Sequence, residues 1–307
     1  MRKVFVLIAA VALAACGEHT PETPAHADAD TVLDSERSSM SASSSGYQPN
    51  AGVPTGCAND ALLCANFDGG SQLPKGWRAS NADTVAVSSD QAYSGLQSLK
   101  VTGSGGGYNQ NFLIYDLTQI PELSASLHGR MMIRLSSENA RSGDFTFIQA
   151  QGQARPASGA PVNTTVMYRA RVDGRHDHLM ANYDTWSDDG TGQNAWSTDC
   201  WSHPESMAPP PQDYLIPKDE WACVQWHFDA NANSLRFWLN GEALRHISVT
   251  NTGDGCLDVN TQDGVWWGAE SFSAIGLGIE QYHSSAEARV MYIDDVAIDT
   301  QPLDCPG

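Results

Sequence analysis

Residues 221–242, with the sequence WACVQWHFDANANSLRFWLNGE, predict the fold of this chain more clearly than any other stretch. Two apolar sets recur with a period of two, at Val224, Trp226 and Phe228 and then at Leu235, Phe237 and Leu239. That period places each set on one face of a strand, and the polar segment 229–234 predicts an antiparallel pair. Asn240-Gly241 predicts a second turn, because this dipeptide tolerates positive φ. The aromatic load predicts a hairpin near the centre of a β-sandwich, and such residues are also typical of any protein core.

The bulk composition limits the classes of protein and partner. The chain has 307 residues, a formal net charge of -19 and seven Cys. This length suits one large all-β domain or two smaller ones, and the sequence shows no internal repeat and no second domain. The acidic balance argues against nucleic acid as a partner, since nothing would neutralise a phosphate backbone. An anionic ligand remains compatible with it, because a local Arg cluster can act within an acidic protein.

The N-terminal residues 1–16 have the pattern of a bacterial lipoprotein signal peptide. Arg2 and Lys3 precede an apolar run over 4–15 that is too short to span a bilayer stably. The run closes in LAAC at 13–16, which resembles a lipobox and implies that Cys16 is lipidated and becomes the mature N-terminus. Gly17, rather than Asp, implies an outer membrane lipoprotein that faces the periplasm or the cell surface. The lipid would then be the chain's one contact with the membrane.

Residues 17–56 are rich in Ser, Ala, Pro and Thr, and they contain almost no large apolar side chain. Such a segment cannot bury enough surface to order itself, so we expect a disordered tether. The folded domain is expected over 57–307.

Six cysteines remain in the folded domain, and an even number in an exported chain implies disulfides. They are Cys57, Cys64, Cys200, Cys223, Cys256 and Cys305. Six cysteines allow fifteen connectivities. Short loops favour Cys57–Cys64 and Cys200–Cys223, which leaves Cys256–Cys305. A metal site is the weaker alternative, because the chain contains no CxxC pair.

The rest of the chain reads as strands separated by turns, with no long stretch of helical period. Besides the hairpin, strands are expected over 61–67, 84–87, 92–101, 111–115, 128–135, 145–150, 164–172, 178–183, 274–281 and 287–298. This pattern predicts an all-β sandwich or barrel.

Several short motifs occur in an order that resembles a known family. They include FDG at 67–69, GW at 76–77, SGLQSLKV at 94–101, FIQAQG at 147–152 and YIDDVAI at 292–298. Together they resemble the cellulose-induced secreted protein family, which is related to glucuronan and alginate lyases. The resemblance covers 57–305 and implies a monomeric concanavalin A-like β-jelly roll of two antiparallel sheets. Binding modules share these motifs, so they indicate a fold more firmly than an activity.

The resemblance also implies a structural Ca²⁺ site that joins the two ends of the domain. Its ligands map to Asp68, to the loop from Ser94 to Gln97, and to Asp294 or Asp295. Carboxylates and carbonyls are the oxygen ligands that Ca²⁺ prefers. The alternative is that these acids are solvated turn residues.

Polar residues recur at alternate positions on three strands and predict a groove. Gln149 and Gln151 share one strand face, as do Glu280 and Tyr282 on a late strand. Gln-Ala-Gln at 149–151 resembles the Gln-Ile-His strand of family 7 alginate lyases, with Gln151 in place of the His. With Arg130 on the strand over 128–135, these side chains are expected to converge.

The resemblance implies β-elimination on a uronic-acid-containing polysaccharide. Arg130 and Gln149 would neutralise the sugar carboxylate, and Tyr282 would transfer a proton. Gln151 cannot act as a base, so the base would be His178 or His283, or Tyr282 would serve both roles. His227 is a further candidate if its face of the hairpin is the concave one.

Two functions without catalysis compete with the lyase. One is a carbohydrate-binding module, whose polar groups only hydrogen-bond sugar hydroxyls. The other is a structural or adhesive lipoprotein with no sugar ligand. The Gly-, Asp- and Pro-rich region 184–217 is expected to be a long loop. Its aromatic residues could stack on sugar rings or form a local core. They are Trp186, Trp196 and Trp201, with Tyr183 just before the region. The chain has no GxSxG or HExxH motif and no paired carboxylates of a retaining glycosidase, which argues against a hydrolase.

Overall fold

The computed structural model describes residues 61–137, 143–155, 164–174, 177–188, 194–202, 214–250, 268–283 and 287–306. The elements described belong to one compact unit, Gly46–Gly307. The strands are β1 (Leu63–Ala65), β2 (Trp77–Ala79), β3 (Val85–Ser88), β4 (Ser98–Gly103), β5 (Asn109–Asp116), β6 (Ser126–Leu135), β7 (Phe145–Ala154), β8 (Thr165–Val172), β9 (Leu179–Asp188), β10 (Asn194–Ser202), β11 (Trp221–Asp229), β12 (Ser234–Leu239), β13 (Glu242–Ala243), β14 (Val249–Thr250), β15 (Ala269–Gln281) and β16 (Arg289–Asp299). Short 3₁₀ helices occupy Leu117–Gln119, Pro121–Leu123 and Arg245–Ile247.

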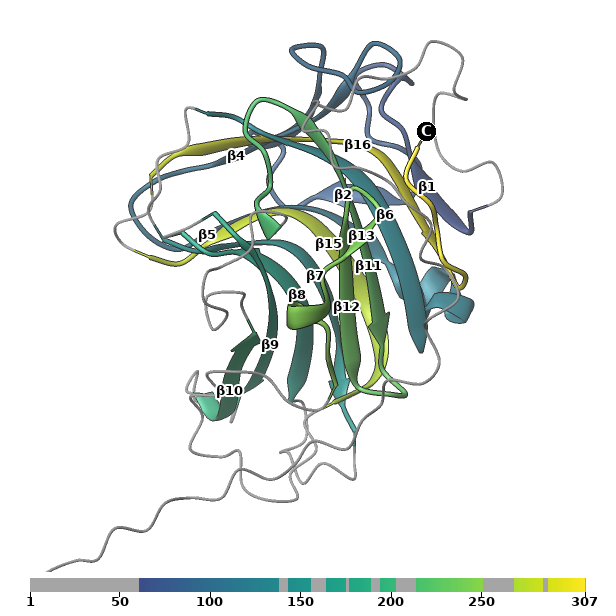
Figure 1. The fold of residues 1–307 in the computed structure, drawn as a ribbon, viewed down its shortest axis with the longest axis vertical. Helices are drawn as coiled ribbons and strands as arrows, with labels where there is room; N and C mark the ends of the chain where they lie inside the picture. The colour runs from purple at the N-terminus through teal and green to yellow at the C-terminus, as the bar shows by residue number, and fades with distance from the viewer. Residues whose placement is uncertain are drawn as a thin grey trace, which may run out of the picture. The chain divides into compact units, whose positions relative to one another are not determined.

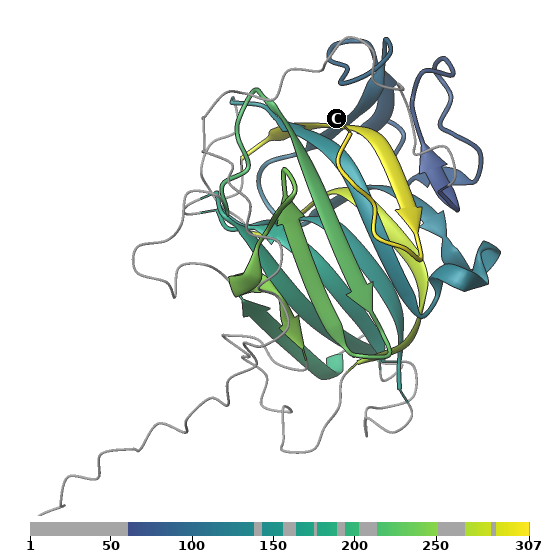
Figure 2. The ribbon, with the colours of Figure 1, turned by 45° about the vertical axis from the view of Figure 1, so that its right-hand side comes forward.

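The strands form two antiparallel sheets that pack face to face, which confirms the jelly-roll sandwich. The nine-stranded sheet has the order β13-β12-β11-β6-β16-β4-β3, with β1 paired to β16 and β14 to β12. The seven-stranded sheet has the order β10-β9-β8-β7-β15-β5-β2. Both sheets curve in the same direction, with the seven-stranded sheet on the inside of the bend (Figure 1). Figure 2 shows β11, β12 and the C-terminal end of β16 on the outer layer.

The hairpin predicted at 221–242 is formed by β11 and β12. Its register pairs Val224 with Leu239 and Phe228 with Leu235, and both apolar sets face the interior. The turn after β12 has the expected backbone, with φ of 53° at Asn240 and 86° at Gly241. Positive φ costs Gly nothing and Asn little, which is why this dipeptide closes the strand.

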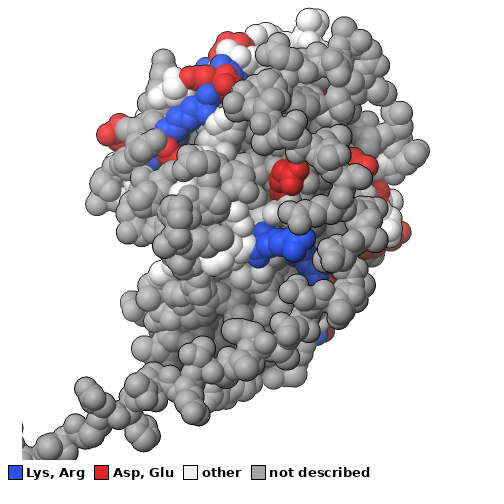
Figure 3. Space-filling view, in the orientation of Figure 1, with Lys and Arg blue, Asp and Glu red and all other residues white. Residues whose placement is uncertain are grey.

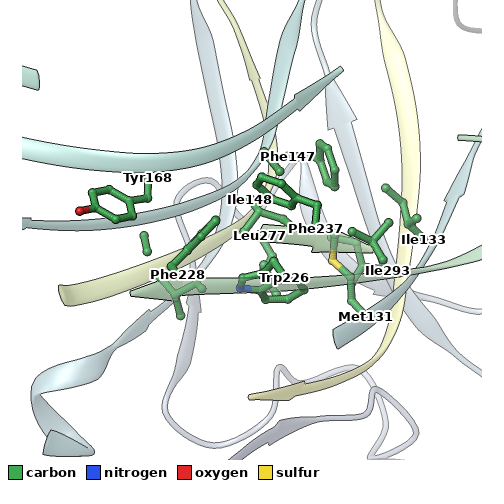
Figure 4. Packing of buried hydrophobic residues seen from close by; sticks show 14 of the residues in the cluster. Met131, Ile133, Phe147, Ile148, Tyr168, Trp226, Phe228, Phe237, Leu277 and Ile293 are labelled. Atoms are coloured by element: carbon green, nitrogen blue, oxygen red, sulfur yellow. The ribbon is translucent and has the colours of Figure 1, made fainter. Parts of the chain in front are cut away.

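The core lies between the sheets and takes side chains from both (Figure 4). Phe228 of the hairpin makes an edge contact with Phe237 at 5.8 Å and with Tyr168 of β8, in the opposite sheet, at 6.1 Å. Replacing a buried Phe by Ala typically costs about 3–5 kcal/mol, so the hairpin is a main source of stability.

The two ends of the domain meet at the edge of this core. β1 pairs with β16, the last strand, with Leu63 opposite Ile298. The neighbourhood of first and last strands was expected from the family resemblance. It brings Asp68, shortly after β1, near Asp294 and Asp295 on β16 through their shared contacts with the loop before β4.

The expected disulfide connectivity is wrong for Cys223. Cys223 bonds to Cys305, with the two Cα atoms 5.9 Å apart, so neither Cys200–Cys223 nor Cys256–Cys305 forms. Short loops were a poor guide, because the C-terminal segment returns across the nine-stranded sheet and places Cys305 over β11. Gln225 of β11 donates to Leu303 O at 2.6 Å. Cys64 and Cys200 are also disulfide-bonded, whereas Cys57 and Cys256 lie outside the described residues.

The region expected as a long loop over 184–217 is in part a hairpin. β9 continues to Asp188 and pairs with β10, with Tyr183 opposite Cys200. Tyr183 is fully buried, so it cannot stack on a sugar at the surface. Trp201 is half-buried, and the side chains of Trp186 and Trp196 lie outside the described residues.

The expected signal peptide, the lipidated Cys16 and the tether over 17–56 also lie outside the described residues. Within the part of the chain that the structure describes, no helix has the length and apolar character needed to cross a membrane.

Candidate functional site

The outer face of the seven-stranded sheet carries the polar side chains that alternate with its core residues. The strand registers align a row across six strands: Arg78, Ile114, Gly276, Gln149, Arg169 and Asn182. The positions next to these on each strand, such as Ile148 and Tyr168, are buried in the core. The period of two therefore places these side chains on one surface on the inside of the bend, polar except where Ile114 and Gly276 interrupt the row.

Arg169 of β8 holds this surface together. Its Nε donates to Gln149 Oε1 at 2.9 Å, and its two terminal nitrogens form ion pairs with Asp184 and with Glu280 Oε2, the latter at 3.2 Å. Arg169 and Glu280 are only 7% and 3% exposed, so each charge depends on the other for compensation. The guanidinium is therefore committed to protein partners.

Glu280 also accepts hydrogen bonds from a tyrosine at the surface. Tyr108 Oη donates to Glu280 Oε1 at 3.1 Å, and Gln110 Nε2 donates to the same oxygen at 3.4 Å. Tyr108 is 68% exposed as a residue, although the hydrogen bond of its hydroxyl to Glu280 is partly buried. Burial of that hydroxyl, followed by the charge of Glu280, raises the pKa of Tyr108 to about 12. The phenol is protonated at neutral pH and points its proton at a carboxylate.

A hollow of about 330 Å³ opens beside this network. Its polar lining comes from Arg78, Ser80, Gln110, Gln149 and Gln151, and its floor includes Phe112, Ile114 and Gly276. Gln149 Nε2 donates to Gln151 Oε1 at 3.4 Å, and within the described residues the amide nitrogen of Gln151 has no acceptor. The hollow thus offers free polar groups above an apolar floor.

Tyr282 does not fit the role expected for it. It follows the end of β15, the Arg171 guanidinium lies 4.6 Å from its ring centre, and its hydroxyl is buried. Burial raises the pKa of Tyr282 far above its ordinary value, so the phenol is protonated at neutral pH. Neighbouring His283 and Arg171 both approach Asp144, at 3.9 Å and 3.6 Å.

His178 is also placed away from the hollow. It immediately precedes β9, its backbone carbonyl accepts from Asp173 N, and only 4% of the residue is exposed. Of the expected groove residues, the structure brings together Gln149, Gln151 and Glu280. Tyr282 and His178 flank the ends of strands of the same sheet and are not part of the hollow's lining.

Arg130 and His227 lie on the other sheet, which corrects the expected convergence. Arg130 of β6 is paired with Gln225 and donates to Asp304 O at 3.3 Å beneath the C-terminal segment. His227 is stacked on His128 with ring centres 3.8 Å apart. Strand alternation shows which residues share a face, but it does not assign a strand to one sheet or the other.

Sequence reasoning missed Arg169, Asp184, Tyr108 and Arg78. A signal for the first was present, because MYRARV at 167–172 alternates core residues with Arg169 and Arg171. Tyr108 lies in a turn, where no periodicity marks it. On the face drawn in Figure 3, Lys and Arg side chains lie beside Asp and Glu side chains and do not form a surface of one sign.

The residues expected to hold Ca²⁺ do gather around the loop 93–97. Asp68 Oδ1 accepts from Leu96 N at 2.7 Å and from Gln97 N at 3.1 Å. Asp294 Oδ2 accepts from Ser94 N at 3.2 Å, and Ser94 Oγ donates to Asp295 Oδ1 at 2.8 Å. Gly95, at a φ of 61°, allows Asp68 to approach so closely that a Cβ there would lie 1.8 Å from its carboxylate.

The chemistry of these groups fits a hard cation. Asp68, Asp294 and Asp295 bring carboxylate oxygens to this loop, which are ligands that Ca²⁺ prefers. The Gln97 amide nitrogen faces Phe67 O at 3.3 Å and Gly70 O at 3.2 Å and donates to both. Burial, and then the charge of Asp295, raise the pKa of Asp294 to about 7. A bound cation would stabilise the ionised form of both carboxylates. The described residues contain no cluster of three His, Cys, Asp or Glu that could hold a metal by itself, so a cation at this loop would need amide and carbonyl oxygens in addition to the carboxylates.

Comparisons with known proteins agree with this architecture. A family model described as polysaccharide lyase-like, Cip1-like, core domain matches residues 75–301. The solved structure of the cellulose-induced protein Cip1 matches with a TM-score of 0.53 and 21% identity, covering 79% of this chain and all of that one. A botulinum neurotoxin serotype C1 binding domain matches with a TM-score of 0.41 and 14% identity, over 81% of this chain and 49% of that one, which is too distant to bear on function. No curated protein sequence matches the chain.

Proposed function

The chain belongs to the family of Cip1-like, polysaccharide lyase-like core domains, and from that premise we propose that its seven-stranded sheet binds a uronic-acid-containing polysaccharide. The hollow on the outer face of this sheet is the observation that carries the proposal. It combines an apolar floor with Gln amides that can hydrogen-bond sugar hydroxyls, which is the usual composition of a small-molecule site.

Binding is tested by affinity electrophoresis in gels that contain glucuronan, alginate or a neutral glucan. We expect an acidic polymer to retard the protein, and Gln151→Ala to weaken the retardation. Arg236→Ala is the matched control, because Arg236 is exposed on β12 of the other sheet. If no acidic polymer retards the native protein, the binding proposal is wrong and a structural or adhesive role is favoured.

We propose cleavage by β-elimination as a second function, because of the contact between Tyr108 and Glu280. An exposed phenol that donates to a buried carboxylate can accept a proton while it passes its own to that carboxylate. In the free protein the pKa of about 12 keeps the Tyr108 phenol protonated and ready for this exchange.

The proton on the carbon next to the sugar carboxylate passes to Tyr108 Oη, while the proton of Tyr108 passes to Glu280 Oε1. The electron pair left on that carbon forms a double bond as the glycosidic C–O bond breaks. The departing oxygen takes the proton from Tyr108, and Glu280 returns its proton to the phenol. Gln110, whose amide contacts Glu280, would hydrogen-bond the sugar carboxylate through its other amide proton.

Elimination leaves an unsaturated sugar that absorbs in the ultraviolet, so incubation with each polymer tests it directly. A rise in absorbance with an acidic polymer is expected. Retardation without absorbance would contradict the lyase and leave a non-catalytic carbohydrate-binding module.

We also propose that Ca²⁺ binds at the loop 93–97 through Asp68, Gln97 and the Asp294–Asp295 pair. Bound there, the ion would neutralise the buried acids and tie β1, β4 and β16 together. A ligand present at a hundred times its Kd stabilises the folded state by roughly 3 kcal/mol. Chelation should therefore lower the Tm by about 5–10 °C, and added Ca²⁺ should restore it. An unchanged Tm would remove the metal from this proposal.

The LAAC motif supports a proposal that the protein is held at the outer membrane through a lipid on Cys16. Incorporation of a labelled fatty acid into the native chain, and its loss in Cys16→Ser, would test this. Equal labelling of both proteins would contradict it.

A further inference from the structure

Arg78 lies on the edge strand of the seven-stranded sheet, and its position is fixed by its neighbour. The side chain of Trp77 is 6% exposed, packs edge-on against Tyr115 at 5.2 Å and donates from Nε1 to Cys64 O at 3.4 Å. Because successive side chains in a strand point to opposite faces, Trp77 in the core directs Arg78 to the outer face. There it lines the hollow.

Arg78 differs from Arg169 because, within the described part of the chain, its guanidinium forms no ion pair or hydrogen bond. The Arg169 guanidinium is occupied by Gln149, Asp184 and Glu280. Among the residues that the structure describes, no carboxylate lies within ion-pair distance of Arg78. Asp116 is near enough to feel its charge, but Asp116 Oδ1 accepts from Thr118 N at 3.0 Å and from Thr118 Oγ1 at 2.6 Å. Arg78 is thus an exposed guanidinium with its donors available.

The geometry of the row leaves room for a sugar between Arg78 and the Gln side chains. Arg78 pairs with Ile114, Ile114 with Gly276, and Gly276 with Gln149. Three strand spacings of about 4.8 Å separate the backbones of β2 and β7, roughly 14 Å in all. Gly276 has no side chain, and the register places Arg78 on one side of it and Gln149, with Gln151 on the same strand, on the other. All of these residues line the hollow.

We propose that Arg78 binds the carboxylate of one sugar unit of an acidic polysaccharide in this hollow, which rests on the proposed function. A guanidinium pairs with a carboxylate through two parallel hydrogen bonds, a geometry that a neutral sugar cannot match. Gln151, with its free amide nitrogen, hydrogen-bonds a hydroxyl of the same unit.

This sugar unit is not the one that reacts. Gln110, which contacts Glu280, is four residues from Ile114 on β5, or about 13 Å along the strand. Arg78 therefore acts on affinity and on the preference for acidic polymers, and the Tyr108–Glu280 pair acts on turnover.

The test compares glucuronan with the same polymer after chemical reduction of its carboxylates to alcohols. We expect the native protein to prefer the acidic form. Arg78→Ala should raise the Kd for glucuronan about tenfold or more and leave the Kd for the reduced polymer unchanged. Arg78→Lys should keep part of the preference, and Arg236→Ala should keep all of it. Because Arg78 is exposed and unpaired, the Tm should not change.

The outcomes separate this inference from the function on which it rests. If the native protein binds neither polymer, the proposed function and the assignment of Arg78 both fail. If the native protein prefers glucuronan and Arg78→Ala keeps that preference, only the assignment of Arg78 fails. If the protein cleaves glucuronan, Arg78→Ala should raise KM and leave kcat within about twofold of the native value. A fall in kcat as large as the rise in KM would show that Arg78 contacts the reacting sugar unit and not a neighbouring one.

Discussion

The two outer faces of the sandwich carry similar polar residues and differ in what those residues contact. On the nine-stranded sheet, Gln225 and Arg130 donate to the backbone carbonyls of Leu303 and Asp304 in the C-terminal segment. On the seven-stranded sheet, Gln151 keeps its amide nitrogen free and Arg78 has no carboxylate partner within the described residues. Polar side chains on a sheet become a candidate site only where the chain does not use them to anchor another segment.

Two of the buried arginines, Arg130 and Arg169, show the same difference. Arg130 fastens the C-terminal segment, whereas Arg169 organises carboxylates beside an open hollow. The nine-stranded sheet has a smaller hollow of about 240 Å³, part of whose wall is the C-terminal segment itself, from Pro302 to Cys305. We therefore expect the outer face of the nine-stranded sheet to contribute to stability and that of the seven-stranded sheet to bind the ligand.

The largest expected effect is on kcat, and it differs between two tyrosines near the seven-stranded sheet, Tyr108 and Tyr282. Tyr108→Phe removes the hydroxyl that contacts Glu280 and should lower kcat on an acidic polymer by about 10²–10⁴-fold, the usual contribution of acid–base catalysis. Tyr282→Phe is the matched control and should keep full activity, because the Tyr282 hydroxyl is buried. Initial rates of ultraviolet absorbance measure both. Full activity in Tyr108→Phe, or its loss in Tyr282→Phe, would reverse the assignment.

The next effect concerns stability and the nine-stranded sheet. The Cys223–Cys305 bond closes a loop with a sequence separation of 82, and chain entropy assigns such a cross-link about 4.5 kcal/mol. The double variant Cys223→Ser, Cys305→Ser should therefore lower the Tm by roughly 10 °C, as measured by thermal unfolding. Its Kd for an acidic polymer should stay within twofold at a temperature where both proteins are folded. A large loss of affinity would show that the two faces are not independent.

The sequence was sufficient for the fold because core strands such as β11 and β12 repeat their apolar residues with a period of two. Trp226, Phe228 and Phe237 are fully buried as that period predicts, and Asn240-Gly241 forms the predicted turn. Gln149 and Gln151 were placed on one face for the same reason. Glu280 lies near these two residues because its strand, β15, pairs with β7.

The rest of the site depends on which strands become neighbours, and local pattern does not contain this. Arg130 and Arg169 both alternate with core residues, so only strand order assigns one to each sheet. Cys305 reaches Cys223 because the C-terminal segment turns back across β11, a contact with no local signal. Tyr108 lies in a turn before β5, and its role follows only from its contact with Glu280, 172 positions away.

The smallest expected effect is a pH dependence that belongs to the nine-stranded sheet. His128 is half-buried and stacked on His227, whose Nε2 lies 2.9 Å from Ser126 Oγ. Burial, followed by the charges of His227 and Arg236, lowers the pKa of His128 to about 4, although Asp229 and Asp299 oppose the shift. Burial also lowers the pKa of His227.

Because the ordinary pKa of His is about 6.5, the unfolded chain binds protons between pH 6.5 and 4 that the folded chain does not. Stability should therefore fall as the pH drops through that window, by an amount on the order of 1 kcal/mol after solvent screening. His128→Gln should flatten this part of the Tm profile and leave binding at pH 7 unchanged. Asp294, whose raised pKa of about 7 acts in the opposite direction, is present in both proteins and cancels in the difference. Parallel Tm profiles for the native protein and His128→Gln would show that the stacked pair contributes no pH dependence. A change in binding at pH 7 in His128→Gln would show that the two faces do not have separate roles.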